Sequence, residues 1–171
     1  MSELEPAPEI PQLSQELSLM AAADQAAREK LADDNGPEDA FAELDRQNMT
    51  RMKVIVAELG WPTIPMVGKD GAFDAWLLVQ QADTEPEFQA QCLELMRACD
   101  AEDVPRRLMG FLDDRVRVAD GKPQLYGTQF LEGADGKPEP CPIEDPEKLD
   151  ERREAIGLGP FEEYRRQVEG G

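Results

Sequence analysis

Apolar residues recur at helical spacing in five successive segments of this sequence, and this pattern constrains the fold most. The clearest segment is 37–59, in which Phe41, Leu44, Met52, Ile55 and Leu59 would lie on one face of a helix. Glycine, proline and aspartate runs separate the segments, and these residues end one helix and begin the next. The pattern predicts helices at 14–32, 37–59, 71–82, 86–100 and 105–121, with 61–65 as an extended loop.

The pattern changes after residue 121. Residues 124–130 alternate in polarity and are rich in strand-forming side chains, while 133–137 has the composition of a turn. Residues 138–143 could return as a short second strand, and a last helical region from 146 to about 168 is interrupted at 157–160. The predicted fold class is mainly α, a compact bundle of five or six helices with one short β-hairpin near residues 124–143.

The 171 residues match the usual size of one domain. Residues 1–12 are rich in proline and glutamate, and we expect a disordered acidic arm there. Residues 13–169 are expected to form a single helical domain with the hairpin.

Charge and composition exclude several function classes. The formal net charge of −19 is spread along the chain, which disfavours nucleic-acid binding. No apolar run approaches the ~20 residues of a membrane span, and the first residues lack a secretory signal, so we expect a cytoplasmic protein outside the membrane. Histidine is absent, and Cys92, Cys99 and Cys141 show no CxxC spacing. We therefore expect reduced cysteines, no metal site and no cofactor.

Polar residues interrupt several apolar helix faces. Asp45 and Asn48 continue the stripe of residues 41–59, Gln80 and Gln81 follow Leu77, and Arg115 continues the face of the fifth helix. Buried polar groups must pair or line a wet pocket, so we expect these residues to converge. The hairpin region supplies complementary groups. The predicted ligand-binding set is Asp45, Asn48, Gln80, Gln81, Arg115, Gln124, Tyr126 and Gln129.

Two interpretations of this set stay open. In one, the residues form a buried structural network, for example with Asp45 paired to Arg115. In the other, they line a polar cleft in which Arg115 binds an anionic group with two hydrogen bonds.

Several short motifs stand out along the sequence: Gly60-Trp61-Pro62, Val67-Gly68, WLLVQQAD at 76–83, Asp114-Arg115-Val116, QLYGTQ at 124–129, Asp45 with Asn48, and Asp150 with Arg152 and Arg153. Together they resemble the signature of a bacterial family, domain-of-unknown-function family 6624. The resemblance implies Gln-His-Ala-Asp where this chain has Gln80-Gln81-Ala82-Asp83. Gln81 can form hydrogen bonds, but it cannot transfer a proton near neutral pH as histidine does.

Three functional hypotheses follow. The first is a non-catalytic binding or interaction protein with a polar cleft for a small polar or anionic ligand. The second is a hydrolase-type enzyme that uses Asp45 or Asp83 as general base and Arg115 to stabilise developing negative charge. The third is an acidic inhibitor or nucleic-acid mimic that binds a basic protein partner, with the segment from Glu85 to Asp103 as its most acidic surface.

Overall fold

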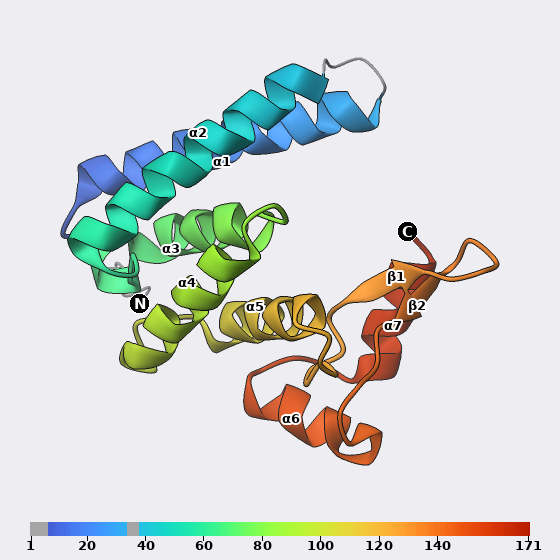
Figure 1. Ribbon diagram of the computed structural model, residues 1–171. Helices are drawn as coiled ribbons and strands as arrows, with labels where there is room; N and C mark the ends of the chain where they lie inside the picture. Colours follow the sequence, from blue (N-terminus) through green and yellow to red (C-terminus); the bar gives the residue numbers. More distant parts are fainter. Residues whose placement is uncertain (1–6, 34–37) are drawn as a thin grey trace, which may run out of the picture. The chain divides into compact units, whose positions relative to one another are not determined.

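The computed structural model describes residues 7–33 and 38–171, and it shows a mainly α-helical chain with one antiparallel hairpin (Figure 1). This confirms the predicted fold class. The chain divides into two compact units, residues 1–104 (unit 1) and 105–171 (unit 2). The single domain expected for 13–169 stays a prediction, and half of the expected N-terminal arm, residues 1–6, lies outside the described residues.

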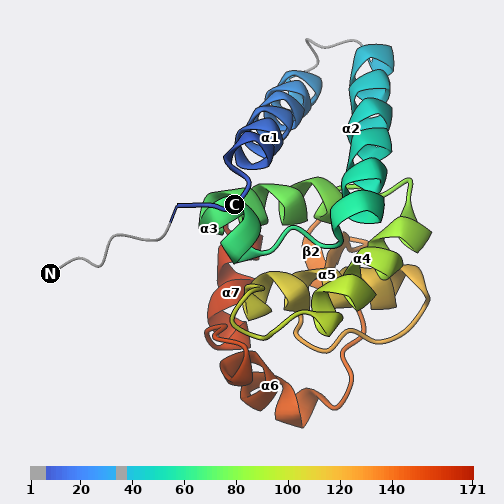
Figure 2. The same cartoon turned by 90° about the vertical axis from the view of Figure 1, so that its left-hand side faces the viewer.

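The described residues of unit 1 form four helices: α1 (Pro11–Ala32), α2 (Glu38–Leu59), α3 (Ile64–Gln80) and α4 (Pro86–Ala98). Helices α1 and α2 extend beyond α3 in both views (Figures 1 and 2). α3 packs most extensively against α1, and the core between the helices includes Leu17, Met52, Ile55 and Val79. Packing around this core brings the C-terminal end of α3 next to the middle of α1. The polar residues of unit 1 lie at this contact.

Helix α1 begins earlier than its predicted start. Its first residue is Pro11, inside the segment expected to be disordered, because proline is well suited to the first helical turn. Just before it, the amides of Glu9 and Ile10 donate to the carbonyls of Pro65 and Met66 at 3.0 and 2.8 Å. These bonds hold residues 9 and 10 against the start of α3.

Helix α3 also differs from its predicted bounds. The sequence predicts an extended loop to residue 65 and a helix from 71, whereas the helical segment begins at Ile64. Pro65 occupies the first turn, where its missing N–H costs nothing. Gly68 interrupts the segment with a left-handed φ of 75°, which glycine adopts without strain.

Unit 2 contains α5 (Arg106–Ala119), α6 (Leu149–Ala155) and α7 (Phe161–Glu169), with a 3₁₀ turn at Pro146–Lys148. Strand β1 (Phe130–Glu132) pairs antiparallel with β2 (Pro138–Pro140). The ring of Phe130 stacks on Phe161, 6.3 Å between centroids, and contacts the edge of Tyr164. The predicted hairpin is confirmed, but its strands are shorter than expected over 124–130 and 138–143. Residues 124–129 form a loop that hydrogen-bonds to side chains, with one isolated bridge between Gln124 and Ile143.

Candidate functional site

The eight residues predicted from the sequence fall in both units. Asp45 and Asn48 lie on α2, and Gln80 and Gln81 lie at the end of α3. Arg115 lies on α5, and the remaining three, Gln124, Tyr126 and Gln129, lie in the loop before β1. That all eight line one cleft stays a prediction, and each unit has its own polar network.

In unit 1, the network is centred on Gln81, which caps the C-terminus of α3. The Gln81 side-chain carbonyl accepts a hydrogen bond from Nε2 of Gln25 at 2.8 Å. Its backbone carbonyl accepts from Nη2 of Arg28 at 3.2 Å. Gln25 and Arg28 belong to α1, so the end of α3 is joined to the middle of that helix. Gln81 is therefore part of a hydrogen-bonded network that joins α3 to α1.

The Arg28 guanidinium is held on three sides. Its Nε donates to Oδ2 of Asp24 at 2.7 Å, its Nη2 donates to the Gln81 backbone carbonyl, and its Cζ lies 5.0 Å from the centroid of the Phe41 ring. Asp24 is only 3% exposed, so this is a buried carboxylate with its counter-charge one helical turn away. Sequence reasoning missed Asp24, Gln25 and Arg28. The signal was present, because Asp24 continues the stripe of Leu13, Leu17 and Ala21.

Asp45 belongs to the same network. Its half-buried carboxylate has a pKa raised above the ordinary aspartate value, chiefly because burial disfavours the charged form. The charge of Arg28 opposes this shift, whereas the charges of Asp24 and Asp83 add to it. The hydroxyl of Thr84 donates to Oδ2 of Asp45 at 3.5 Å, at the long limit for such a bond. Asp45 is therefore close enough to Asp24 and Arg28 of α1 for their charges to change its pKa.

Asn48 lies almost one turn after Asp45 on α2, so both side chains share one helix face. Asn48 is 5% exposed, and its Nδ2 finds no hydrogen-bond partner among residues 7–33 and 38–171. A buried amide donor without an acceptor costs about 1–3 kcal/mol. We call the residues Asp24, Gln25, Arg28, Asp45, Asn48 and Gln81 the α1–α3 polar cluster.

In unit 2, the buried carboxylate of Asp114 binds the loop 124–129. It accepts from the amides of Leu125 at 2.7 Å, Tyr126 at 3.0 Å and Thr128 at 3.0 Å, and from the Thr128 hydroxyl at 2.9 Å. Asp114 is 0% exposed. Burial raises the pKa of Asp114, and these donors act in the opposite direction. Because the amides point at one carboxylate, they do not form a strand ladder.

Two glutamines predicted as ligand-binding residues complete this loop. Nε2 of Gln124 donates to the carbonyls of Gln129 and Cys141, both at 2.9 Å, and its Oε1 accepts from the Gln129 amide at 2.8 Å. Nη1 of Arg115 donates to Oε1 of Gln129 at 3.0 Å. The carboxamide of Gln124 is saturated inside the protein, as a structural network requires.

Two arginines near the C-terminus donate hydrogen bonds to backbone carbonyls of the same loop. Arg153, 2% exposed, donates to the carbonyls of Tyr126 at 2.6 Å and Gly159 at 2.7 Å, and Tyr164 lies 5.1 Å from its guanidinium carbon. Nε of Arg152 donates to the Leu125 carbonyl at 2.7 Å. The loop also approaches α7 closely at Gly127, where a Cβ would lie 2.7 Å from the Phe161 ring. We call Asp114, Arg115, Gln124, Thr128, Gln129, Arg152 and Arg153 the Asp114 network.

All three cysteines are free thiols, and burial raises the pKa of Cys92 to about 12. Such a thiol is unreactive near neutral pH. In the described part of the chain, no three cysteine or carboxylate side chains are grouped so that they could hold a metal ion. No helix in the same part is both long and apolar enough to cross a bilayer.

These features describe a class: a mainly α-helical protein with one small hairpin, an arginine-clamped loop and a polar cluster at a helix end. The family model described as a family of unknown function, DUF6624, matches residues 11–171, and the chain belongs to this family. The match confirms the resemblance drawn from the motifs. Searches of curated proteins and of solved structures give no match.

Proposed function

We propose that this protein is a non-catalytic binding protein and that the α1–α3 polar cluster takes a small polar ligand. One observation carries the proposal: the buried Nδ2 of Asn48 lacks an acceptor among the described residues, beside an aspartate that burial holds at a raised pKa. A ligand oxygen bonded to Nδ2 would remove the cost of the unsatisfied donor.

The chemistry of the cluster indicates what the ligand carries. Asp45 can accept from a cationic or hydroxyl donor, and Asn48 can donate to a carbonyl or carboxylate oxygen. Arg28 is already engaged by Asp24, Gln81 and Phe41, so the cluster offers no uncommitted guanidinium for an anion. The cluster therefore favours a ligand with neighbouring donor and acceptor groups, such as an amino acid, over a simple anion.

Gln81 supports binding over catalysis. An amide side chain does not change protonation near neutral pH, and the Gln81 carbonyl oxygen already accepts from Gln25. Residues of this kind position a ligand without taking part in proton transfer.

The test is a thermal-unfolding screen of the purified protein. Fluorescence of Trp61 and Trp76 reports on unit 1, since both tryptophans are buried there. The panel contains the twenty amino acids, small alkyl amines and simple carboxylates. A compound present at 100 times its Kd adds about 2.7 kcal/mol, which raises the melting temperature by roughly 5–10 °C at this chain length.

The matched variants are Asp45→Asn and Asn48→Leu, with Asp39→Asn on the exposed face of α2 as the control. We expect the shift caused by a donor–acceptor compound to disappear in both cluster variants and to persist in the control. A panel without any effect on the wild-type protein would contradict the proposal. So would a shift that all three variants retain.

A second candidate is a hydrolase in which Asp45 is the general base, and the raised pKa of Asp45 favours it. Chromogenic ester and amide substrates separate the candidates. Turnover that Asp45→Asn abolishes, while substrate binding persists, would establish the enzyme. Binding without turnover would leave the binding protein.

A further inference from the structure

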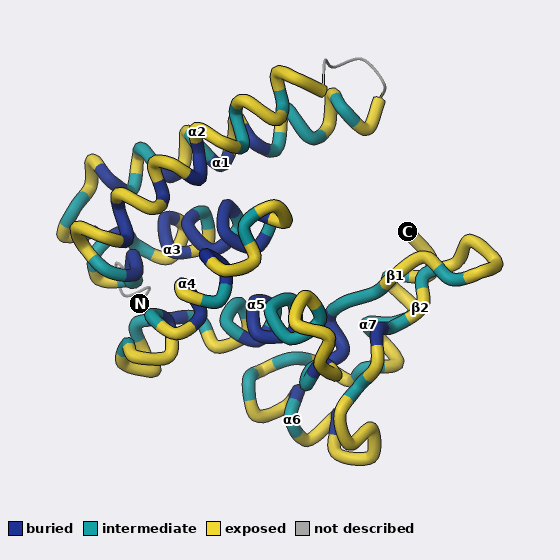
Figure 3. The backbone as a smooth tube through the Cα atoms, in the orientation of Figure 1, coloured by how far each residue is buried: buried dark blue, intermediate teal, exposed yellow. Residues whose placement is uncertain are grey.

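The α1–α3 polar cluster lies at the boundary between the buried and the exposed parts of α1 and α2. All buried residues of α1 precede residue 25, and all buried residues of α2 follow residue 47, so Asp24 is the last buried residue of α1 and Asn48 the first of α2. In Figure 3 the dark blue of buried residues on these helices is confined to the parts away from the segment that joins them. The half-buried Asp45 lies almost one turn nearer the exposed end of α2 than Asn48, so a ligand that approaches Asp45 from solvent meets Asn48 next.

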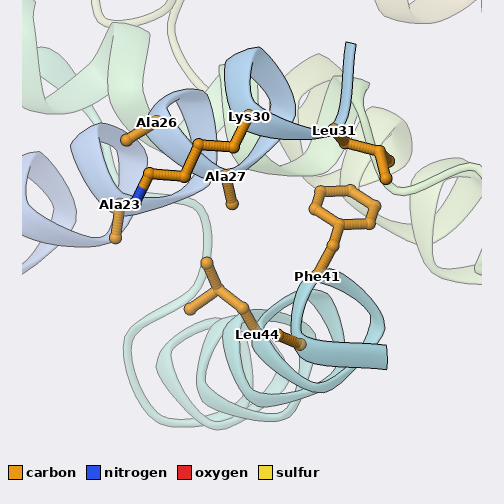
Figure 4. Close-up of a pocket in the computed structure, with 8 residues that line it drawn as sticks. Ala23, Ala26, Ala27, Lys30, Leu31, Phe41 and Leu44 are labelled. Carbon is orange, nitrogen blue, oxygen red and sulfur yellow. The ribbon is translucent and has the colours of Figure 1, made fainter. Parts of the chain in front are cut away.

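The charges around Asp45 indicate the charge of the ligand. Arg28 is the one cation of the cluster, and its Nε already donates to the carboxylate of Asp24 at 2.7 Å. Its guanidinium carbon also lies 5.0 Å from the ring of Phe41, which projects from α2 towards α1 (Figure 4). Within residues 7–33 and 38–171, the one hydrogen bond to the Asp45 side chain comes from the Thr84 hydroxyl at 3.5 Å. The Asp45 carboxylate is therefore available to a cationic group of a ligand.

The same arrangement opposes a negative charge on the ligand. Asp24 and Asp83 act on Asp45 as like charges, and they would repel an anionic group bound beside it in the same way. Nδ2 of Asn48, in a side chain that is 5% exposed, needs an acceptor oxygen but no negative charge. A neutral carbonyl oxygen satisfies this donor without bringing a second carboxylate next to Asp45.

We propose that the ligand of the cluster carries an α-ammonium group next to a neutral carbonyl, as a peptide N-terminus or an amino-acid amide does. The ammonium group binds Asp45, and the carbonyl oxygen accepts from Nδ2 of Asn48. Side chains at i and i+3 of a helix lie about 5–6 Å apart at Cβ, a span that an α-amino carbonyl with its two hydrogen bonds bridges. The inference rests on the proposed binding function and narrows it, because a free amino acid has a carboxylate in place of the neutral carbonyl.

Four related compounds test the inference on the wild-type protein. Alaninamide carries both groups, alanine has a carboxylate in place of the neutral carbonyl, N-acetylalaninamide lacks the ammonium group, and isopropylamine lacks the carbonyl. Titration calorimetry at about pH 6.5 keeps the ammonium group protonated, because an α-amino group has a pKa of about 7.7–8.0. We expect alaninamide to bind at least tenfold more tightly than each of the other three compounds.

Two cluster variants test which side chain holds which group. Asp45→Asn should weaken the binding of alaninamide at least tenfold and remove its advantage over alanine. Asn48→Leu should weaken alaninamide to the level of isopropylamine. Asp39→Asn, at an exposed position of α2, is the control and should bind the four compounds as the wild type does. If Asn48→Leu fails to fold by circular dichroism, the wild-type compound series and Asp45→Asn still decide the outcome.

The results separate this inference from the proposed function. Alanine that binds as tightly as alaninamide would overturn the inference and leave the binding protein in place. So would the absence of binding by all four compounds when another compound of the thermal panel binds in an Asn48-dependent way. A panel without any effect would overturn both. Tighter binding of alanyl-alaninamide than of alaninamide would support a peptide N-terminus as the ligand, and weaker binding would support a small amide.

Discussion

The Asp114 network and the α1–α3 polar cluster both bury polar side chains, but they satisfy them differently. In unit 2, Asp114 accepts from three backbone amides and a hydroxyl, and Gln124 uses both ends of its carboxamide. In unit 1, Asn48 is also buried, yet its Nδ2 lacks a partner among the described residues, and burial raises the pKa of Asp45 beside it.

This difference distinguishes a structural network, in unit 2, from a candidate binding site, in unit 1. A saturated network stabilises one conformation, because each donor and acceptor is already matched. A network with an unmatched donor and a destabilised carboxylate raises the free energy of the protein without a ligand. A ligand that pairs with these groups would lower that free energy, which favours binding. Polar residues on apolar helix faces therefore indicate where to look, and their hydrogen bonds indicate which of the two roles they have.

The largest expected effect is the loss of Asp114. Asp114→Ala leaves three amides and a hydroxyl without their acceptor, and we expect the free energy of unfolding to fall by roughly 3–5 kcal/mol. Urea unfolding measures this change in free energy. The circular dichroism of the tyrosines reports on unit 2, because Tyr126 and Tyr164 are the only tyrosines of the sequence and both belong to that unit. Asp120→Ala, at an exposed position of the same unit, should change stability by less than about 0.5 kcal/mol.

The same experiment tests the predicted single domain. Tryptophan fluorescence reports on unit 1 alone, because both tryptophans precede residue 105. If residues 13–169 unfold as one domain, Asp114→Ala shifts the tryptophan and tyrosine transitions together. Separate transitions would show that the two units unfold independently.

A matched pair of amide substitutions sharpens the comparison. Gln124→Leu removes three hydrogen bonds from a fully buried side chain, and we expect it to cost about 2–4 kcal/mol. Asn48→Leu removes an unmatched donor, so the free energy of unfolding should be unchanged or higher. A comparable loss in both variants, measured by urea unfolding, would mean that Asn48 is as structural as Gln124.

The smallest expected effect is the pH dependence of Asp45→Asn. Because the folded pKa of Asp45 is raised above its unfolded value, the folded state takes up the proton first as pH falls. The charged carboxylate therefore lowers stability at neutral pH, and this cost disappears as the pH falls through the raised pKa towards about 4. We expect Asp45→Asn to be more stable than wild type at pH 7 and the gain to shrink towards pH 4.

Asp39→Asn, at an exposed position of α2, is the control for this pH series. A gain for Asp45→Asn that stays constant from pH 7 to pH 4 would rule out a titrating carboxylate as its cause. Thermal unfolding at several pH values is sufficient to distinguish the two results.

The sequence predicted most helices because their apolar spacing is local. The stripe from Phe41 to Leu59 identified α2 within one residue of its start, and the glycine at 60 marked its end. The segment 124–129 misled the same reasoning, since its alternation resembles a strand. Its conformation is set by Asp114, ten or more residues earlier, which no alternation pattern reveals.

The candidate site shows a similar division. Spacing alone placed Asp45 and Asn48 on a helix face, and the same rule applied to residues 13–28 would have added Asp24. It could not show that Gln25 meets Gln81, because these residues are 56 positions apart. Nor could it show which buried amide stays unmatched.

The sequence by itself determined the helices, the presence of a hairpin and the family, because these follow from spacing and motifs along the chain. The tertiary structure alone decided which polar groups saturate one another and which do not. The physical reason is that a hydrogen bond depends on distances of about 3 Å between atoms, and helix packing sets those distances for residues far apart in the chain.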